Sequence, residues 1–282
     1  QGVPLNGCHL FPISVTCFSV LTHTVTGIAR DAYGKEVTVS PDASSSDVAS
    51  TASSSDETEH HAQVARPSDS LRDTEDLRER LERWMAGKVP SGSTVTVADV
   101  TLPAANGMSS ETILFDATWD GEHHPLVARV APTESTMPVF PAYDLESQFR
   151  TMAQVREHSA VPVPAVYWSE SDPHALGAPF FVMERISGDV PPDVMPYNFG
   201  SWVTEASPEQ RKTLQRSSVD VLAKLHAIDK PGERFDFLRL PNSGTTAREA
   251  FTAHIAEQRA YYEWVVSDGI RSPLIERALD WI

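Results

Sequence analysis

Arg129 and a loop rich in small residues, 106–110, have the composition of a phosphate-binding site. Gly107, Ser109 and Ser110 lie in this loop, and backbone N–H groups and hydroxyls on such a loop can approach phosphate oxygens closely. Arg129 would add a fixed positive charge with forked donors beneath them. The alternative interpretation is an ordinary hairpin that carries a solvated arginine.

The segments around these residues predict an antiparallel meander. A strand is expected from Thr101 up to the loop, and residues 111–119 alternate between apolar and polar side chains, as a half-buried strand does. Asp120 and Gly121 form a favoured turn pair because both tolerate positive φ. A third strand is predicted over 125–130. The predicted meander places the loop and Arg129 on neighbouring strands.

Glu146 is the candidate partner of Arg129. Asp144 can cap a helix whose apolar face contains four regularly spaced residues, Leu145, Phe149, Met152 and Val155. Glu146 lies beside that face, and the sequence predicts that it forms an ion pair with Arg129. Alternatively, Glu146 complements the helix dipole and pairs with Arg150 four residues later.

Further elements follow from caps and apolar patterns. Two more strands are expected, over 165–168 and 179–184, which complete a small five-stranded lobe. The remaining helices are expected to start at Asp73 or Thr74, at Pro208, near Thr246 and at Pro273.

Composition excludes several classes of function. The chain has 282 residues and a formal charge of −16, which disfavours nucleic acid and anionic lipid as partners. An anionic ligand therefore needs a local site. Cys8 and Cys17 cannot support a disulfide framework or a cysteine metal site in the later part of the chain, so a cytoplasmic setting is expected.

The first 70 residues are predicted to be a disordered or spurious extension. Residues 40–70 are mostly Ser, Asp, Ala, Thr and Glu, with little to bury. The apolar run 10–21 is broken by Pro12, is too short to span a membrane and has no basic residue before it. One hypothesis places the authentic start at Val37, read from an alternative start codon.

Seven motifs in order resemble the aminoglycoside phosphotransferase family, in particular its branch related to the kinase domain of acyl-CoA dehydrogenase family proteins. The resemblance covers about residues 71–282. The motifs are Gly107-Met-Ser-Ser-Glu-Thr112, Leu126-Val-Ala-Arg129, Leu145-Glu-Ser-Gln-Phe-Arg-Thr-Met152, Val161-Pro-Val-Pro164, Pro179-Phe-Phe-Val-Met-Glu184, Gly188-Asp-Val-Pro-Pro-Asp193 and Val221-Leu-Ala-Lys-Leu-His226.

The resemblance implies an α+β, protein-kinase-like bilobal fold with ATP between the lobes. It implies an N-lobe over 71–186, with a five-stranded antiparallel sheet and one helix, and a partial helical C-lobe over 187–282. Arg129 falls at the position of the phosphate-contacting lysine and Glu146 at that of its glutamate partner. The hinge whose backbone receives adenine would be Met183, Glu184, Arg185 and Ile186.

The sequence departs from the family in two respects. Arginine replaces lysine at position 129, which keeps the charge but changes its geometry. The family's Gly-Asp…Asn loop and the following Asp, which orient the acceptor and hold Mg²⁺, have no counterpart between Pro196 and Ile282. The chain therefore resembles a fragment truncated before its catalytic segment, with no catalytic residue or metal ligand of its own. On this basis the 282-residue chain is predicted to be inactive.

Three hypotheses remain from the sequence. The first is an ATP-dependent phosphotransferase acting on a hydroxyl of a small molecule, with Mg²⁺ ligands expected in a later segment. The second is a non-catalytic, kinase-like module that binds a nucleotide or a partner. The third is a helical binding protein with no nucleotide role, favoured if Arg129 and Glu146 lie far apart. Because the lower lobe is incomplete, some packing partners are expected to be missing for five apolar residues, which would expose apolar surface and promote aggregation: Phe251, Tyr262, Trp264, Leu279 and Trp281.

Overall fold

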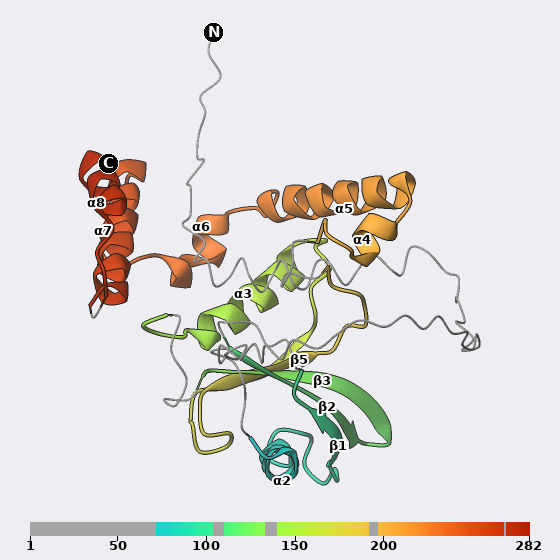
Figure 1. Cartoon of the computed structure of the whole chain (residues 1–282). Coiled ribbons are helices and arrows are strands. Elements are labelled where there is room, and N and C mark those ends of the chain that lie inside the picture. The colour runs from blue at the N-terminus through green and yellow to red at the C-terminus, as the bar shows by residue number, and fades with distance from the viewer. Residues whose placement is uncertain (1–71, 104–109, 133–139, 192–196, 268) are drawn as a thin grey trace, which may run out of the picture.

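A five-stranded antiparallel sheet with a helix on each face forms one end of the molecule, and further helices lie beyond it (Figure 1). The structure is a computed structural model, and it describes residues 72–103, 110–132, 140–191, 197–267 and 269–282. The predicted extension over residues 1–70 lies outside the described residues. The domain boundaries at 186 and 187 remain a prediction.

The sheet is built from a meander and a second pair of strands. Its strands are β1 (Thr96–Thr101), β2 (Glu111–Trp119), β3 (Glu122–Val130), β4 (Val166–Glu170) and β5 (Phe180–Glu184), in the order β1-β2-β3-β5-β4. Strand β3 begins three residues before the predicted start. The reason is the two-residue turn: Asp120 and Gly121 have φ of 53° and 77°, so pairing continues up to Trp119 and Glu122.

Helix α2 (Thr74–Met85) covers one face of the sheet. Asp73 caps it as predicted, with Oδ1 accepting hydrogen bonds from the N–H groups of Glu75 and Asp76. The helix buries Leu77, Leu81 and Met85 against the side chains that alternate inward from β2, β3 and β5. Trp84 fixes this layer further, because its ring lies 4.7 Å from that of Phe180 and its Nε1–H donates to Glu170.

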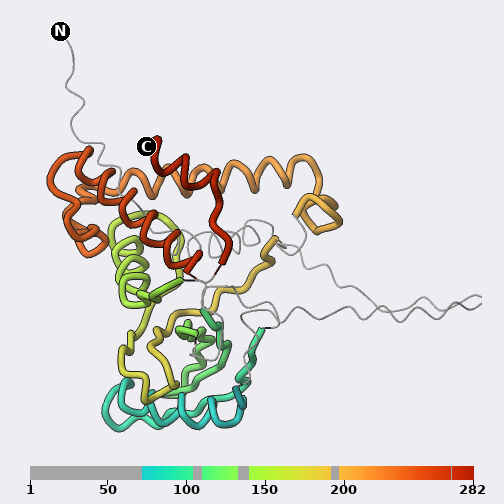
Figure 2. The backbone as a smooth tube through the Cα atoms, turned by 60° about the vertical axis from the view of Figure 1, so that its left-hand side comes forward, coloured from blue at the N-terminus to red at the C-terminus, as the bar shows by residue number. Residues whose placement is uncertain are grey.

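Helix α3 (Leu145–His158) lies on the opposite face (Figures 1 and 2). Asp144 caps it, as the sequence predicts, and Phe149 packs edge-on against Phe181 of β5 with ring centroids 6.2 Å apart. Its far end contributes Val155 to a second apolar cluster with helix α5 and the segment after it, made of Val161, Val163, Val221, Ile228 and Phe235. Helix α3 therefore connects the sheet to the helical part. The sheet carries two helices rather than the one expected.

The helical part contains α4 (Trp202–Glu205), α5 (Pro208–His226), α6 (Pro231–Arg234), a 3-10 turn η2 (Asp236–Leu238), α7 (Ala247–Val265) and α8 (Pro273–Trp281). The three long helices begin where their caps predict, at Ser207, Thr246 and Ser272. Helices α4 and α6 were not predicted, because four residues are too few to show a helical period.

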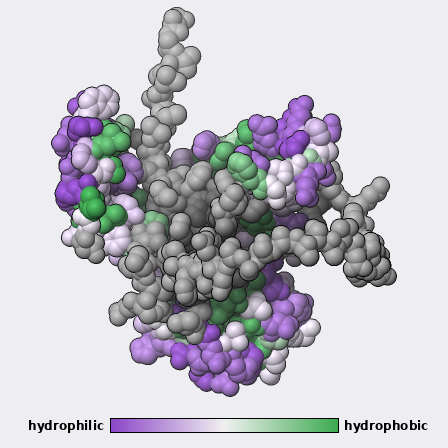
Figure 3. Space-filling view, in the orientation of Figure 1, coloured by the Kyte–Doolittle hydropathy of each residue, from purple (hydrophilic) through white to green (hydrophobic). Residues whose placement is uncertain are grey.

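Helices α7 and α8 form a hairpin with much exposed apolar surface, visible as hydrophobic patches in Figure 3. Phe251 is 55% exposed and Trp281 is 88% exposed, in agreement with the expectation for these two residues. Tyr262 differs from that expectation: it is buried, and its hydroxyl accepts a hydrogen bond of 2.7 Å from the Ser272 N–H. Within the described ranges, no helix has both the length and the apolar character needed to cross a membrane.

Candidate functional site

Arg129 lies in a transverse row of four residues on the α3 side of the sheet. Strand pairing places it between Thr112 of β2 and Phe181 of β5, and Ser169 of β4 follows beyond Phe181. Directly paired residues of an antiparallel sheet project from the same face. The row therefore ends at Ser169 on β4, two strands away from Arg129.

No carboxylate that the structure describes forms an ion pair with the Arg129 guanidinium. Its Nε is buried, and among the described residues it has neither a hydrogen-bond partner nor an ion pair. Burial lowers the pKa of Arg129 to about 10, because the charged form is removed from water. Ser110, directly before β2, and Gln148 of α3 likewise have a buried side-chain oxygen without a partner. Such groups are costly unless a ligand or water completes them.

Glu146 does not form the predicted ion pair with Arg129, so the argument for a nucleotide site drawn from this pair is removed, and this outcome favours the third hypothesis. The side chain is exposed, and its carboxylate accepts a hydrogen bond from the Ser169 hydroxyl at the β4 end of the row. Two strand spacings, about 10 Å at the backbone, separate Ser169 from Arg129. The pairing with Arg150, the other interpretation, is also absent: Arg150 stacks on the Phe237 ring at 3.9 Å.

The backbone after β5 offers one acceptor and one donor. The Glu184 N–H donates to the Ala165 carbonyl at 2.8 Å, but the Ala165 N–H donates to the Glu184 side chain instead of the Glu184 carbonyl. The Glu184 carbonyl is therefore left without a backbone N–H donor from the neighbouring strand. Two residues later, on the same side of an extended chain, the Ile186 N–H makes no hydrogen bond with any residue that the structure describes.

Arg185 holds this segment against the sheet. Its N–H donates to the Pro125 carbonyl at 3.0 Å, and its guanidinium pairs with Asp116 of β2. Asp116 lies opposite Pro125 in the β2–β3 ladder, so the ion pair spans the proline of the intervening strand. Met183 precedes this segment at a half-buried position opposite Val127 on the Arg129 face.

Gly107 and Ser109 lie outside the described residues. Of the predicted loop, Ser110 alone is described, and its buried hydroxyl lies directly before β2. For a metal, the described ranges contain no group of three or more His, Cys, Asp or Glu side chains that could serve as ligands.

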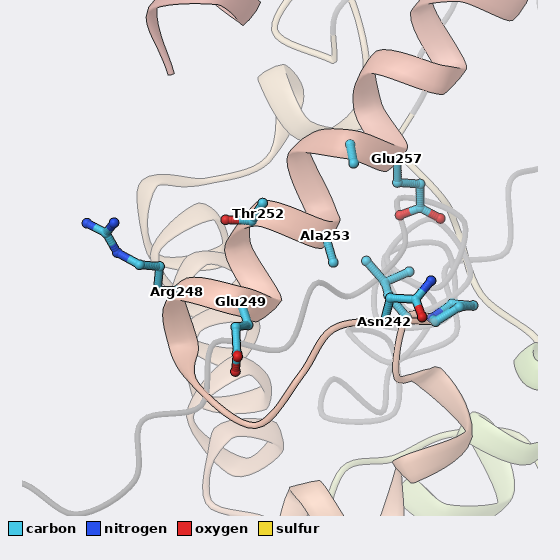
Figure 4. A pocket seen from close by; sticks show the side chains of 9 residues that line it. Asn242, Arg248, Glu249, Thr252, Ala253 and Glu257 are labelled. Atoms are coloured by element: carbon cyan, nitrogen blue, oxygen red, sulfur yellow. The ribbon is translucent and has the colours of Figure 1, made fainter.

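A separate cavity of about 580 Å³ lies between residues 240–242 and the first half of α7 (Figure 4). Its polar side chains do not converge on one point. Arg248 points away from Asn242 and Glu257, and Glu249 is turned toward the start of the helix, where it accepts hydrogen bonds from Thr245 and Thr246. The row around Arg129 has the unpartnered polar groups that this cavity lacks, and it is the stronger candidate site.

A kinase-like nucleotide lobe has an antiparallel sheet with a buried cation on a face that a helix covers. A backbone segment with open hydrogen-bonding groups follows the last strand of that sheet. Residues 100–269 match the model of the phosphotransferase enzyme family (APH), more than half of the chain. The chain belongs to this family. Its α+β, protein-kinase-like fold and the family predicted from the sequence are thereby confirmed.

Two further proteins are similar over part of the chain. The Arabidopsis thaliana protein named probable acyl-CoA dehydrogenase IBR3 is 27% identical over 124 residues, which is 44% of this chain and 14% of the plant protein. The crystal structure of a candidate aminoglycoside phosphotransferase from Ralstonia eutropha JMP134 is 22% identical, with a TM-score of 0.42. The match covers 72% of this chain and 51% of that one.

Sequence reasoning missed two residues of the site. Asp116 is one of several polar residues that alternate with the buried side chains of β2, and nothing local distinguishes it from Thr112 or Thr118. Gln148 was detectable in principle, because it lies three residues after Leu145 and four before Met152 on the buried face of α3. A buried amide on that face is an informative signal, since buried polar groups require partners.

Proposed function

We propose that this chain binds a nucleoside triphosphate between the sheet and the helical part, as the nucleotide lobe of a phosphotransferase acting on a hydroxyl of a small molecule. The observation that carries the proposal is the buried Arg129 guanidinium, which pairs with no carboxylate of the described residues and whose Nε has no hydrogen-bond partner among them. The family supports phosphoryl transfer, and the cation supports an anionic ligand at this place.

The phosphates would lie beside Arg129 and Ser110. A guanidinium donates forked hydrogen bonds to phosphate oxygens, and a hydroxyl can add a further one. The Gly107 loop would cover the phosphates, as the family resemblance implies. With a net charge of −16, the chain must hold such a ligand by local contacts and not by its overall field.

The base would lie against the segment Met183 to Ile186. The Glu184 carbonyl can accept from the adenine amino group, and the Ile186 N–H can donate to a ring nitrogen. Val127 and Leu114 line the same face of the sheet and would contact the ring. Adenine presents a donor, its amino group, beside an acceptor, N1, so this pair of backbone groups can bind that edge of the base.

The 282 residues alone are proposed to transfer no phosphate. The Gly-Asp…Asn loop that would orient the acceptor is absent from residues 196–282, and so is the following Asp. A phosphotransferase built on this lobe would take its acceptor-orienting Asp and its Mg²⁺ ligands from a later segment. A non-catalytic nucleotide-binding module is the second candidate, favoured by the same missing loop.

The test is nucleotide binding by the full 282-residue chain, measured calorimetrically with ATP, ADP and adenosine. We expect ATP and ADP to bind more tightly than adenosine. Arg129→Met should weaken the binding of ADP by about tenfold or more, because a charge-assisted contact is lost. Arg80→Met, which removes a surface arginine paired with Asp76, is the matched control and should leave the affinity unchanged.

ATP consumption over a panel of hydroxylated acceptors separates the two candidates. The 282-residue chain should show none, whereas a version extended to the natural end of the gene should be active if the protein is an enzyme. An extended chain that binds ATP without consuming it would favour the non-catalytic module. Lack of ATP binding by the 282-residue chain would refute the proposal.

A further inference from the structure

We propose that Gln148, not Glu146, is the residue of α3 that faces Arg129, so that the site holds a neutral amide where a carboxylate is expected. Arg129 then keeps its full positive charge for the phosphates. This inference rests on the proposed function, and it makes Gln148 a positioning residue for the Arg129 guanidinium.

The rotation of α3 about its axis assigns the flank that faces Arg129 to Gln148. Helix α3 lies over β4 and β5, with Glu146 bonded to Ser169 of β4 and Phe149 packed on Phe181 of β5. Glu146 and Gln148 lie about 160° apart around a helix axis, with Phe149 between them on the inward side. Beyond Phe149 the buried side chains of Leu145 and Met152 follow around the helix, and Gln148 closes this buried face on the flank opposite Glu146.

Burial supports the same assignment. Gln148 is 5% exposed, whereas Glu146 is exposed. The Gln148 Oε1 has no hydrogen-bond partner in the part of the chain that the structure describes, and neither has the Nε of Arg129. These are complementary groups, an acceptor on the helix and a donor on the sheet. They do not bond to each other in this structure, so both are available to a ligand or to a rearranged Arg129 side chain.

The acidic residues around the site have other partners. Asp116 pairs with Arg185, and Glu146 bonds to Ser169. Glu111 projects from the other face, where its Oε2 lies 2.7 Å from the Arg72 Nε, although the N–H is not aimed for a hydrogen bond. Within the described ranges, no carboxylate neutralises Arg129. An anionic ligand would therefore supply the missing negative charge.

The experiment uses Gln148→Glu in the full 282-residue chain, which places a carboxylate beside Arg129. Binding of pyrophosphate, ADP and adenosine is measured together with the melting temperature of the free protein. The new carboxylate should pair with Arg129 and weaken pyrophosphate and ADP by about tenfold or more, while adenosine changes less than about twofold. The free protein should melt at a higher temperature, because a buried cation gains a partner.

Two variants serve as controls. Glu146→Gln makes the opposite change on the exposed flank and should alter neither the anion affinities nor the melting temperature. Gln148→Met removes the amide without adding charge, so it should weaken ADP less than Gln148→Glu does. A merely structural Gln148 gives a different pattern: Gln148→Glu then lowers the melting temperature and leaves the ratio of ADP to adenosine affinity unchanged, which refutes the inference.

The outcomes distinguish this inference from the proposed function. If the unmodified chain binds ATP and Gln148→Glu has no effect, the inference is wrong and the proposed function is retained. Binding of pyrophosphate but not ATP, with the expected loss in Gln148→Glu, supports the inference and refutes the nucleotide function. If neither ligand binds the unmodified chain, both are wrong.

Discussion

Arg129 is the residue where stability and binding oppose each other. Its folded-state pKa, lowered to about 10, lies below the ordinary value because burial disfavours the cation. A base with a lowered pKa binds its proton less well when folded, so its charge destabilises the fold wherever it is protonated in both states. This cost is complete below about pH 10 and is relieved as the pH rises further, because the unfolded chain then binds more protons.

Arg129→Met should therefore stabilise the ligand-free protein at pH 7, by on the order of 1–3 kcal/mol of unfolding free energy. The gain should be constant between pH 6 and 9 and should shrink above about pH 10, where the native arginine begins to lose its proton. Urea denaturation at pH 7 and at pH 10.5 measures it, with Arg80→Met as the control. A less stable Arg129→Met at pH 7 would mean that Arg129 has a stabilising partner.

At the scale of elements, the segment after β5 depends on the β2–β3 hairpin. The Arg185 side chain reaches Asp116 across Pro125, and its N–H bonds to the Pro125 carbonyl. His123 adds a weaker contact, with its Nε2 3.6 Å from Asp116. The ion pair therefore connects the backbone segment that we propose receives the base to β2, the strand after the predicted loop 106–110.

Asp116→Ala should release Arg185 and loosen the Glu184 and Ile186 backbone groups. We expect adenosine and ATP to bind about three- to tenfold more weakly, while pyrophosphate, which contacts the other end of the site, changes less than about twofold. Calorimetry with the three ligands checks this. Asp76→Ala, which breaks the surface ion pair with Arg80, is the control. An equal loss for pyrophosphate would contradict a role confined to the base.

At the scale of the whole molecule, apolar surface gathers on the α7–α8 hairpin and the residues that join its helices. Ile270 is 97% exposed, Leu274 is 69% exposed and Trp281 is 88% exposed. Large exposed apolar patches promote association. Tyr261 of α7 contacts Phe140, with ring centroids 6.3 Å apart, and Figure 1 shows most of the hairpin apart from the sheet.

Replacing Ile270, Leu274 and Trp281 together by Glu should reduce self-association of the 282-residue chain and its binding of a hydrophobic dye. ADP affinity should stay within about twofold, because the ligand site is not touched. Sedimentation velocity checks the first expectation and calorimetry the second. Three glutamates at exposed polar positions of α5, Thr213, Gln215 and Ser217, form the control with equal added charge. Unchanged association in the triple variant would assign it to another surface.

The sequence by itself determined the elements, because their signals are local. Each signal acts within a few residues: the alternation over Glu111–Trp119, the turn at Asp120 and Gly121, and the caps at Asp73, Asp144 and Ser207. The structure confirms each of them. The order of motifs was also sufficient to predict the family, which the family match over residues 100–269 confirms.

Only the tertiary structure decided which side chains meet. The row of Arg129, Phe181 and Ser169 depends on pairing between strands that are far apart in the chain, and α3 could have presented either flank to that row. A difference of two residues turns a helical side chain by about 160°, which separates Glu146 from Gln148 although both follow the same cap. Packing of Phe149 on Phe181 sets that rotation, and no local signal in the sequence encodes it.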